Sequence, residues 1–210
     1  MATHPHSDSP QISANEALAR LVAGNERFLR GESHWLGLHR EAIADLTGGQ
    51  QPFATILGCS DSRVPPEIVF DAGLGELFIV RVAGNVISGE VAGSLQYAGA
   101  HLHTPLFVVL GHERCGAVQA ALATRLEGTR HRSRIHILVE NILAGLGEVD
   151  PAAPPDAQLS RAVEQNVRWT VRQIAESPEG HARLAEGSMR LMGAIYEIAS
   201  GRVRFLEDRD

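Results

Sequence analysis

The chain has 210 residues, of which 44% are hydrophobic and 21% are charged, and its formal net charge is −6 at pH 7. This length and composition predict a single globular domain over residues 1–210. The negative charge argues against nucleic-acid binding, and the basic cluster from Arg125 to Arg134 is expected to be a solvated loop. We find no run of 18 apolar residues and no secretory signal, so we expect no membrane partner and a cytoplasmic location.

The first predicted elements form an N-terminal helical arm over residues 13–48. Residues 1–12 are largely polar and are expected to be flexible. Ser13 with Glu16 three positions later is a capping box, and it predicts an amphipathic helix that ends at Gly31. A second, short helix is expected from His39 to Leu46.

The middle of the chain alternates between apolar strands and helical patterns. The segments expected to be strands are 53–57, 77–82 and 106–110. The segments expected to be helices are 90–102, 118–126, 135–146 and 156–177, with at most a helical turn at 67–70. This alternation predicts an α/β fold with a central, mostly parallel sheet flanked by helices. Residues 189–198 and 202–206 are expected to form a C-terminal β-hairpin.

Two of the predicted strands end in polar loops that contain a cysteine. Cys59, Asp61 and Arg63 follow the first strand, and His112 and Cys115 follow the third. Ligands of α/β proteins bind beyond the carboxyl ends of the strands, so we expect these two loops to meet. Two thiolates, one imidazole and one carboxylate are a tetrahedral set suited to Zn²⁺.

The two cysteines leave three interpretations open: a disulfide, two inert buried thiols, or two metal ligands. The charged residues beside both cysteines favour the metal site. Four protein ligands would close that site, so catalysis requires one ligand that water can replace. Asp61 fits this role because Arg63, two residues further on, offers its carboxylate another charged partner.

The sequence resembles the β-class carbonic anhydrases in two motifs, Cys-x-Asp-x-Arg at residues 59–63 and His-x-x-Cys at residues 112–115. The similarity runs from about Ala14 to Leu206. Outside the motifs it is carried by residues 49–53, 64–67, 75–85 and 116–117. The resemblance implies reversible hydration of CO₂ to bicarbonate and a proton, by attack of zinc-bound hydroxide.

That resemblance also implies a role for each residue of the two motifs. Cys59, His112 and Cys115 would bind one Zn²⁺ per subunit, with Asp61 as a displaceable fourth ligand. The Asp61–Arg63 dyad would be the catalytic switch that decides whether the carboxylate lies on the metal.

A substrate pocket of the plant-like, type I kind is a further implication of the resemblance. Its residues would be Gln50, Phe78, Ala83, Tyr97 and Gly116. Ile56 stands where bicarbonate-inhibited members have Trp, so we predict no bicarbonate-locked form.

Relatives share each pocket between two protomers, and Gln50 and Tyr97 would come from the subunit opposite to the metal. This implies a homodimer, or a larger assembly such as a tetramer, in which the N-terminal helices embrace the partner. His101 and His103 could relay protons or could be ordinary surface histidines. Hydrolysis of CS₂ or COS on the same scaffold, and a zinc-binding or redox-sensing protein without catalysis, remain as alternatives.

Overall fold

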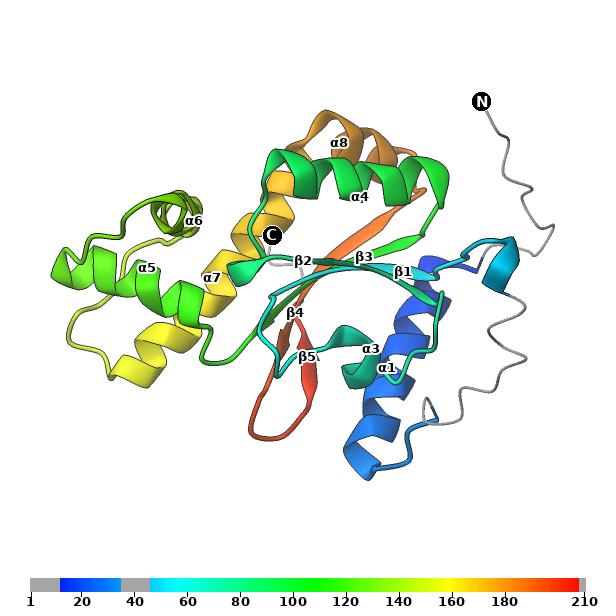
Figure 1. Cartoon of the computed structure of the whole chain (residues 1–210), viewed down its shortest axis with the longest axis horizontal. Helices are drawn as coiled ribbons and strands as arrows, with labels where there is room; N and C mark the ends of the chain where they lie inside the picture. Colours follow the sequence, from blue (N-terminus) through cyan, green and yellow to red (C-terminus); the bar gives the residue numbers. More distant parts are fainter. Residues whose placement is uncertain (1–11, 35–45, 208–210) are drawn as a thin grey trace.

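Helices cover both faces of a five-stranded sheet in the computed structural model, which describes residues 12–34 and 46–207 (Figure 1). The strands are β1 (Ala54–Gly58), β2 (Leu77–Arg81), β3 (Leu106–His112), β4 (Arg190–Tyr196) and β5 (Val203–Phe205). Their order in the sheet is β2-β1-β3-β4-β5; the first four are parallel, and β5 is antiparallel to β4. The predicted α/β class, the mostly parallel sheet and the C-terminal strand pair are confirmed.

The helices follow the predicted order, with small shifts at their ends. They are α1 (Ala14–Arg30), α3 (Pro66–Val69), α4 (Gly89–His101), α5 (Gly116–Glu127), α6 (Arg134–Leu143), α7 (Pro155–Glu176) and α8 (Pro178–Ala185), with short 3₁₀ helices η2 (Leu46–Gly48) and η3 (Ala83–Asn85). Helix α1 begins as predicted, because the Ser13 hydroxyl accepts the Glu16 N–H, and it ends at the left-handed Gly31. Apart from Ile12 and Leu46, the predicted flexible start and the predicted helix at 39–46 lie outside the described residues.

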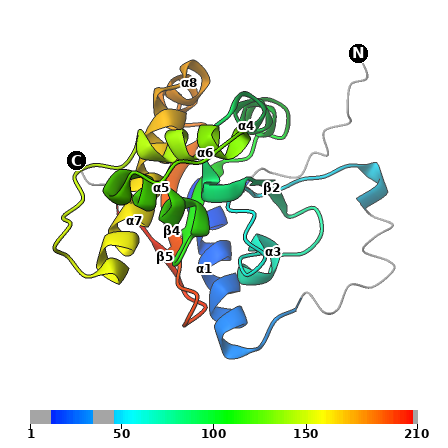
Figure 2. The ribbon, with the colours of Figure 1, turned by 60° about the vertical axis from the view of Figure 1, so that its left-hand side comes forward.

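Each central strand buries both of its faces, which explains its nearly unbroken apolar sequence. On β1, Ile56 packs into a core with α1 and α3, while the next residue, Leu57, packs into the opposite core under α4, α5 and α7. Successive side chains of a strand point to opposite faces, so one apolar run can serve both cores. Figures 1 and 2 show α1 and α3 on one side of the sheet and α4 and α8 on the other.

Close packing of α7 fixes the carboxyl end of β3. Gly111 lies next to Val167 of α7, and a Cβ at Gly111 would overlap that side chain. Strand β3 extends two residues beyond the predicted end because Gly111 and His112 pair with Ile195 and Tyr196 of β4. His112 is therefore held as the last residue of a central strand.

Helix α8 is an element that the sequence analysis did not identify. It follows α7 directly, and the Ser177 hydroxyl accepts the Gly180 N–H at its start, with Pro178 in the first turn. A serine cap followed by proline is a signal of a helix start that could have located it. Within the described parts of the chain, no helix combines the length and apolar character needed to cross a membrane.

Candidate metal centre

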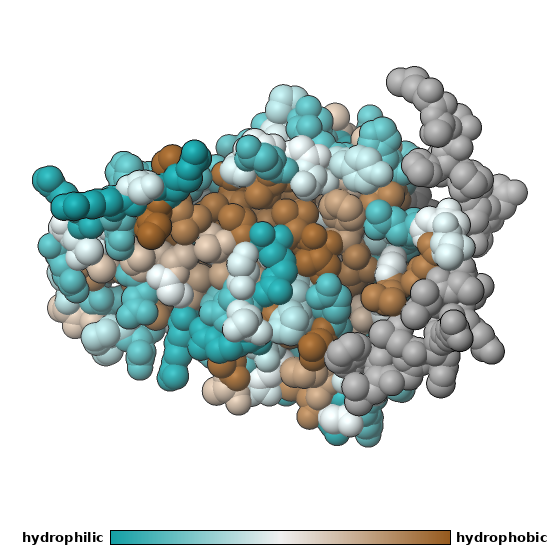
Figure 3. Space-filling model, viewed as in Figure 1, coloured by the Kyte–Doolittle hydropathy of each residue, from teal (hydrophilic) through white to brown (hydrophobic). Residues whose placement is uncertain are grey.

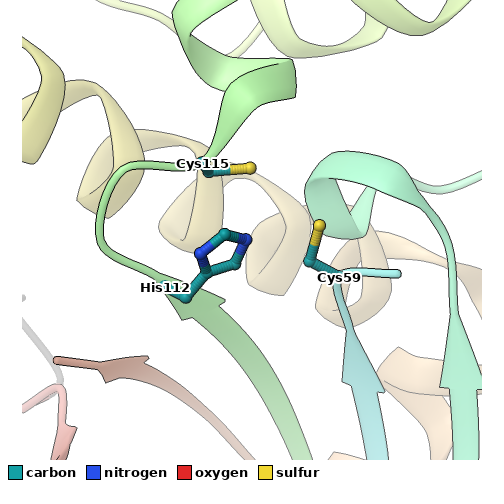
Figure 4. Close-up of side chains that lie close together, drawn as sticks. All are labelled: Cys59, His112 and Cys115. Carbon is teal, nitrogen blue, oxygen red and sulfur yellow. The ribbon is translucent and has the colours of Figure 1, made fainter. Parts of the chain in front are cut away.

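Three side chains from two separate segments of the chain converge at the carboxyl ends of β1 and β3 (Figure 4). Cys59 follows β1, His112 ends β3, and Cys115 immediately precedes α5. Their sulfur and nitrogen ligand atoms all lie within 4.8 Å of one another. Both cysteines are free thiols, and all three residues are at most 5% exposed. The expectation that the two loops meet is confirmed, and a disulfide is not formed.

The orientation of His112 suits a metal ligand. Its Nδ1 lies 2.8 Å from the carbonyl oxygen of Glu113. A carbonyl only accepts hydrogen bonds, so Nδ1 carries the proton and Nε2 keeps its lone pair. Nε2 is buried and has no hydrogen-bond partner, although it faces both sulfurs. A buried polar atom without a partner is costly, and a bound cation would satisfy it.

Backbone N–H groups stabilise negative charge on both sulfurs. The Gly84 N–H donates to Cys59 Sγ at 3.3 Å. The hydrogen bond from Cys115, together with the backbone N–H groups of Gly84 and Asp61, lowers the pKa of Cys59 to about 4 despite its burial. The Cys59 thiolate and burial raise the pKa of Cys115, while N–H groups at the start of α5 act in the opposite direction. These contacts favour the thiolate form of Cys59, and a divalent cation would displace the proton of Cys115.

Asp61 lies beside the ligand cluster and is held by Arg63. The Arg63 side chain donates from Nε to Asp61 Oδ1 at 2.9 Å and from Nη2 to Oδ2 at 2.7 Å, and its backbone N–H donates to Oδ1 at 3.0 Å. These bonds hold the pKa of Asp61 well below its usual range. Asp61 Oδ2 is 3.9 Å from His112 Nε2, so the carboxylate borders the cluster while bound to the guanidinium.

The residues predicted to form the substrate pocket fall into three groups. Gly116 is the first residue of α5 and directly follows Cys115, and Ala83 lies in η3 next to Gly84, whose N–H donates to Cys59 Sγ. Phe78 of β2 and Tyr97 of α4 contact each other, with ring centroids 6.1 Å apart.

The fifth pocket residue, Gln50, is exposed and precedes β1, at the opposite end of that strand from Cys59. The five residues of β1 span about 16 Å. This distance places Gln50 away from the metal ligands of its own chain.

Arg81 is a functional candidate that the sequence analysis did not identify. At the end of β2, its side chain donates to the backbone oxygens of Cys59 at 2.9 Å and Asp61 at 2.6 Å. It therefore braces the loop that carries both residues. From the sequence alone, a charged residue at the end of an edge strand is expected to be solvated. Its contacts become visible only when β2 is paired with β1, which places Arg81 opposite Gly58.

The donor set fits Zn²⁺. Zinc is a borderline-soft ion that takes thiolate and imidazole ligands in tetrahedral geometry, and two sulfurs and one nitrogen leave a fourth position for water or substrate. The buried, partnerless Nε2 of His112 and the N–H donors at the two sulfurs agree with that assignment.

Comparisons with known proteins agree with the fold. A family model described as carbonic anhydrase matches residues 54–203. Carbonic anhydrase 2 of Mycobacterium tuberculosis is 40% identical over 195 residues, which cover 92% of this chain and 93% of that protein.

Two solved structures share the fold over most of their length. The β-carbonic anhydrase CcaA superposes with a TM-score of 0.71 at 25% identity, covering 93% of both chains. One of two tetrameric β-carbonic anhydrases from the ascomycete Sordaria macrospora superposes with a TM-score of 0.72 at 23% identity, covering 91% of this chain and 97% of that one.

Proposed function

This chain belongs to the β-class carbonic anhydrase family, an enzyme family, and we propose that it catalyses the reversible hydration of CO₂ to bicarbonate and a proton at Zn²⁺ bound by Cys59, His112 and Cys115. The observation that carries this proposal is the convergence of two sulfurs and the partnerless His112 Nε2 within 4.8 Å. When bound, zinc lowers the pKa of water and so supplies a nucleophile for CO₂ near neutral pH.

Asp61 is the residue that orients the attacking water in this proposal. Its carboxylate borders the ligand cluster, 3.9 Å from His112 Nε2. From there it can accept a hydrogen bond from the water and direct an oxygen lone pair toward CO₂. The proton released by the reaction passes to buffer.

Arg63 keeps the fourth ligand position available. Its side chain and backbone donate three hydrogen bonds to the Asp61 carboxylate, and a paired guanidinium and carboxylate are a strong, geometrically specific interaction. While Asp61 is bound in this way, it leaves room for water. If Arg63 released it, Asp61 could become a fourth ligand and close the site, so the pair would act as a switch.

The pocket for CO₂ is completed by a second copy of the chain. Gln50 lies at the far end of β1, so it cannot reach the metal site of its own chain. We assign Tyr97 and its neighbour Phe78, like Gln50, to the residues that the partner subunit contributes to each pocket. Ala83 and Gly116 would line the wall beside the metal ligands. Gln50 would donate a hydrogen bond to a substrate oxygen, and the two aromatic rings would provide an apolar surface for CO₂.

Exposed apolar side chains support assembly into at least a homodimer. Tyr97 is 43% exposed, and Leu74, Ile135 and Ile137 are each more than half exposed. Figure 3 shows a hydrophobic band across one face of the molecule, bordered by hydrophilic side chains. Exposed apolar areas of this kind mark protein interfaces. In the proposed dimer the N-terminal helices contact the partner, and the tetrameric structure from Sordaria macrospora makes a tetramer a natural larger form.

Zinc analysis combined with stopped-flow CO₂ hydration tests the activity. We expect one zinc per chain and hydration well above the buffer rate at pH 8 to 9. Zinc-loaded protein without hydration activity would refute the proposal. Sulfide release from COS or CS₂ that exceeded the hydration rate would instead assign the site to those sulfur analogues.

Shared pockets are tested by mixing two inactive variants. Gln50→Ala removes a residue that each pocket takes from one subunit, and Cys59→Ala removes a ligand that it takes from the other. A mixed dimer then contains one pocket with both defects and one intact pocket. We expect activity to return on mixing, whereas pockets built from one chain would stay inactive.

A further inference from the structure

Two buried polar side chains of α7 hold η3 in place. Asn166 Nδ2 donates to the carbonyl oxygen of Gly84 at 2.8 Å, and Thr170 Oγ1 donates to that of Asn85 at 3.1 Å. Asn166 is 1% exposed and Thr170 is 0% exposed. They lie four residues apart, so they occupy the same face of α7. Neither residue touches the metal ligands, and neither belongs to the predicted motifs.

The 3₁₀ helix that they hold directs one N–H group at a metal ligand. The Gly84 N–H donates to Cys59 Sγ at 3.3 Å, while the Gly84 carbonyl faces Asn166. Gly84 has a φ of +70°, and a Cβ there would lie 2.8 Å from Cδ1 of Ile142. Only glycine fits this conformation and this space without strain. The direction of the N–H is thus set by the position of η3.

We propose that Asn166 and Thr170 are positioning residues for the Cys59 thiolate, acting through the Gly84 N–H. A hydrogen bond to a thiolate ligand withdraws charge from sulfur, which makes it a weaker donor and leaves more positive charge on the metal. The proposal rests on the proposed zinc site, but it concerns the donor strength of one sulfur. Without Asn166, the Gly84 carbonyl would lose its buried donor and η3 would be free to shift.

Cobalt substitution gives a readout that a purely structural role would not change. Co²⁺ in a thiolate site has a sulfur-to-metal charge-transfer band whose energy depends on the donor strength of the sulfur. The test variants are Asn166→Leu and Thr170→Val, which remove the donors and keep most of the side-chain volume. We expect the charge-transfer band to shift to lower energy, because Cys59 becomes a stronger donor without the Gly84 hydrogen bond. We also expect about a tenfold weaker metal affinity, measured by competition with a chelator, because η3 no longer holds the sulfur in position for the metal.

Matched controls come from buried polar residues away from the site. Asn25 donates to the carbonyl oxygens of Val69 and Gly201 and accepts from the Val203 N–H, and Thr104 shares a hydrogen bond with Thr55. Asn25→Leu and Thr104→Val should lower the melting temperature while the band and the metal affinity keep their wild-type values.

The proposal is overturned if the α7 variants keep the wild-type band and affinity, or if the control variants shift them equally. Should Asn166→Leu fail to fold, the near-isosteric Thr170→Val decides the question alone. The outcome is also separable from the proposed activity, because the cobalt band reports the sulfur ligand whether or not the protein hydrates CO₂.

Discussion

Replacing Asp61 by Asn tests the proposed switch most directly. The carboxylate accepts three hydrogen bonds from Arg63, through both of its oxygens. An amide has one acceptor oxygen, and its NH₂ group would face an N–H donor of the guanidinium. The variant therefore loses both the acceptor for the attacking water and the paired geometry. The substitution leaves the three proposed zinc ligands unchanged.

The expected loss of activity follows from the role of a positioned proton acceptor. Such groups contribute about 10²- to 10⁴-fold to a rate, which corresponds to about 3 to 5 kcal/mol of transition-state stabilisation. We expect kcat/KM for CO₂ hydration to fall by that factor at pH 8 while zinc stays near one per chain. Stopped-flow hydration with a pH indicator and metal analysis of the same sample measure both quantities.

A second Asp–Arg pair in the chain provides a matched control. The buried carboxylate of Asp71 accepts from Arg27 Nε and from the His34 N–H, away from the metal ligands. Asp71→Asn should lower the melting temperature and leave the activity per bound zinc unchanged. If Asp61→Asn kept the wild-type kcat/KM, the proposed role of the Asp61–Arg63 pair would be wrong.

Three further predictions concern metal binding, the braced loop and acid stability. Cys115→Ala should lose zinc by metal analysis and melt at the temperature of chelator-treated wild type, because binding energy is also folding energy; retained zinc would contradict the ligand assignment. Arg81→Gln should release zinc to a chelator faster than the wild type, because the loop that carries Cys59 loses two hydrogen bonds. Arg190→Gln, at the opposite end of the sheet, should release zinc at the wild-type rate. If the two variants released zinc equally fast, Arg81 would have no role in holding the metal loop. Burial disfavours the Glu164 carboxylate, but hydrogen bonds from two arginines outweigh it and lower its pKa. Its stabilisation, about 1 kcal/mol, is therefore fully present above about pH 4.5, the ordinary pKa of the group, and is lost as the pH falls through the lower folded pKa. Urea unfolding of zinc-free protein should show Glu164→Gln less stable than wild type at pH 7, with a difference that shrinks as the pH falls below about 4.5. A difference that stays constant with pH would refute the linkage.

The ligand cluster could be predicted from the sequence because its spacing and the strand pattern point to the same place. Cys59 and His112 each stand where an apolar run stops, and apolar runs of this kind predict adjacent buried strands. What only the structure shows is how the residues of β1 and β3 pair with each other. Gly58 pairs with Leu110, so Cys59 begins one residue beyond that pair and His112 two residues beyond it.

The residues that surround the ligands could not be predicted in the same way. Asn166 and Thr170 lie within an amphipathic helix, where a polar residue reads as part of the solvated face, yet both are buried against η3. Arg81 looks like an exposed strand end until β2 is placed beside β1. Such contacts join segments far apart in the chain, and local patterns do not contain them.

Strand order explains why Cys59 can be held from both sides. In the order β2-β1-β3, the connection from β1 to β2 runs in one direction across the sheet, and the connection from β2 to β3 runs back past β1 in the other direction. Ligand sites of α/β sheets form where the strand order reverses in this way. The loop after β1 therefore has a neighbour on each side. On one side, Arg81 at the end of β2 donates to the loop carbonyls, and Gly84 of the following η3 donates its N–H to the sulfur. On the other, the end of β3 supplies His112 and Cys115. If β1 were an edge strand, one of these contributions would be lost, so the metal loop requires the central position of β1 as well as its own cysteine motif.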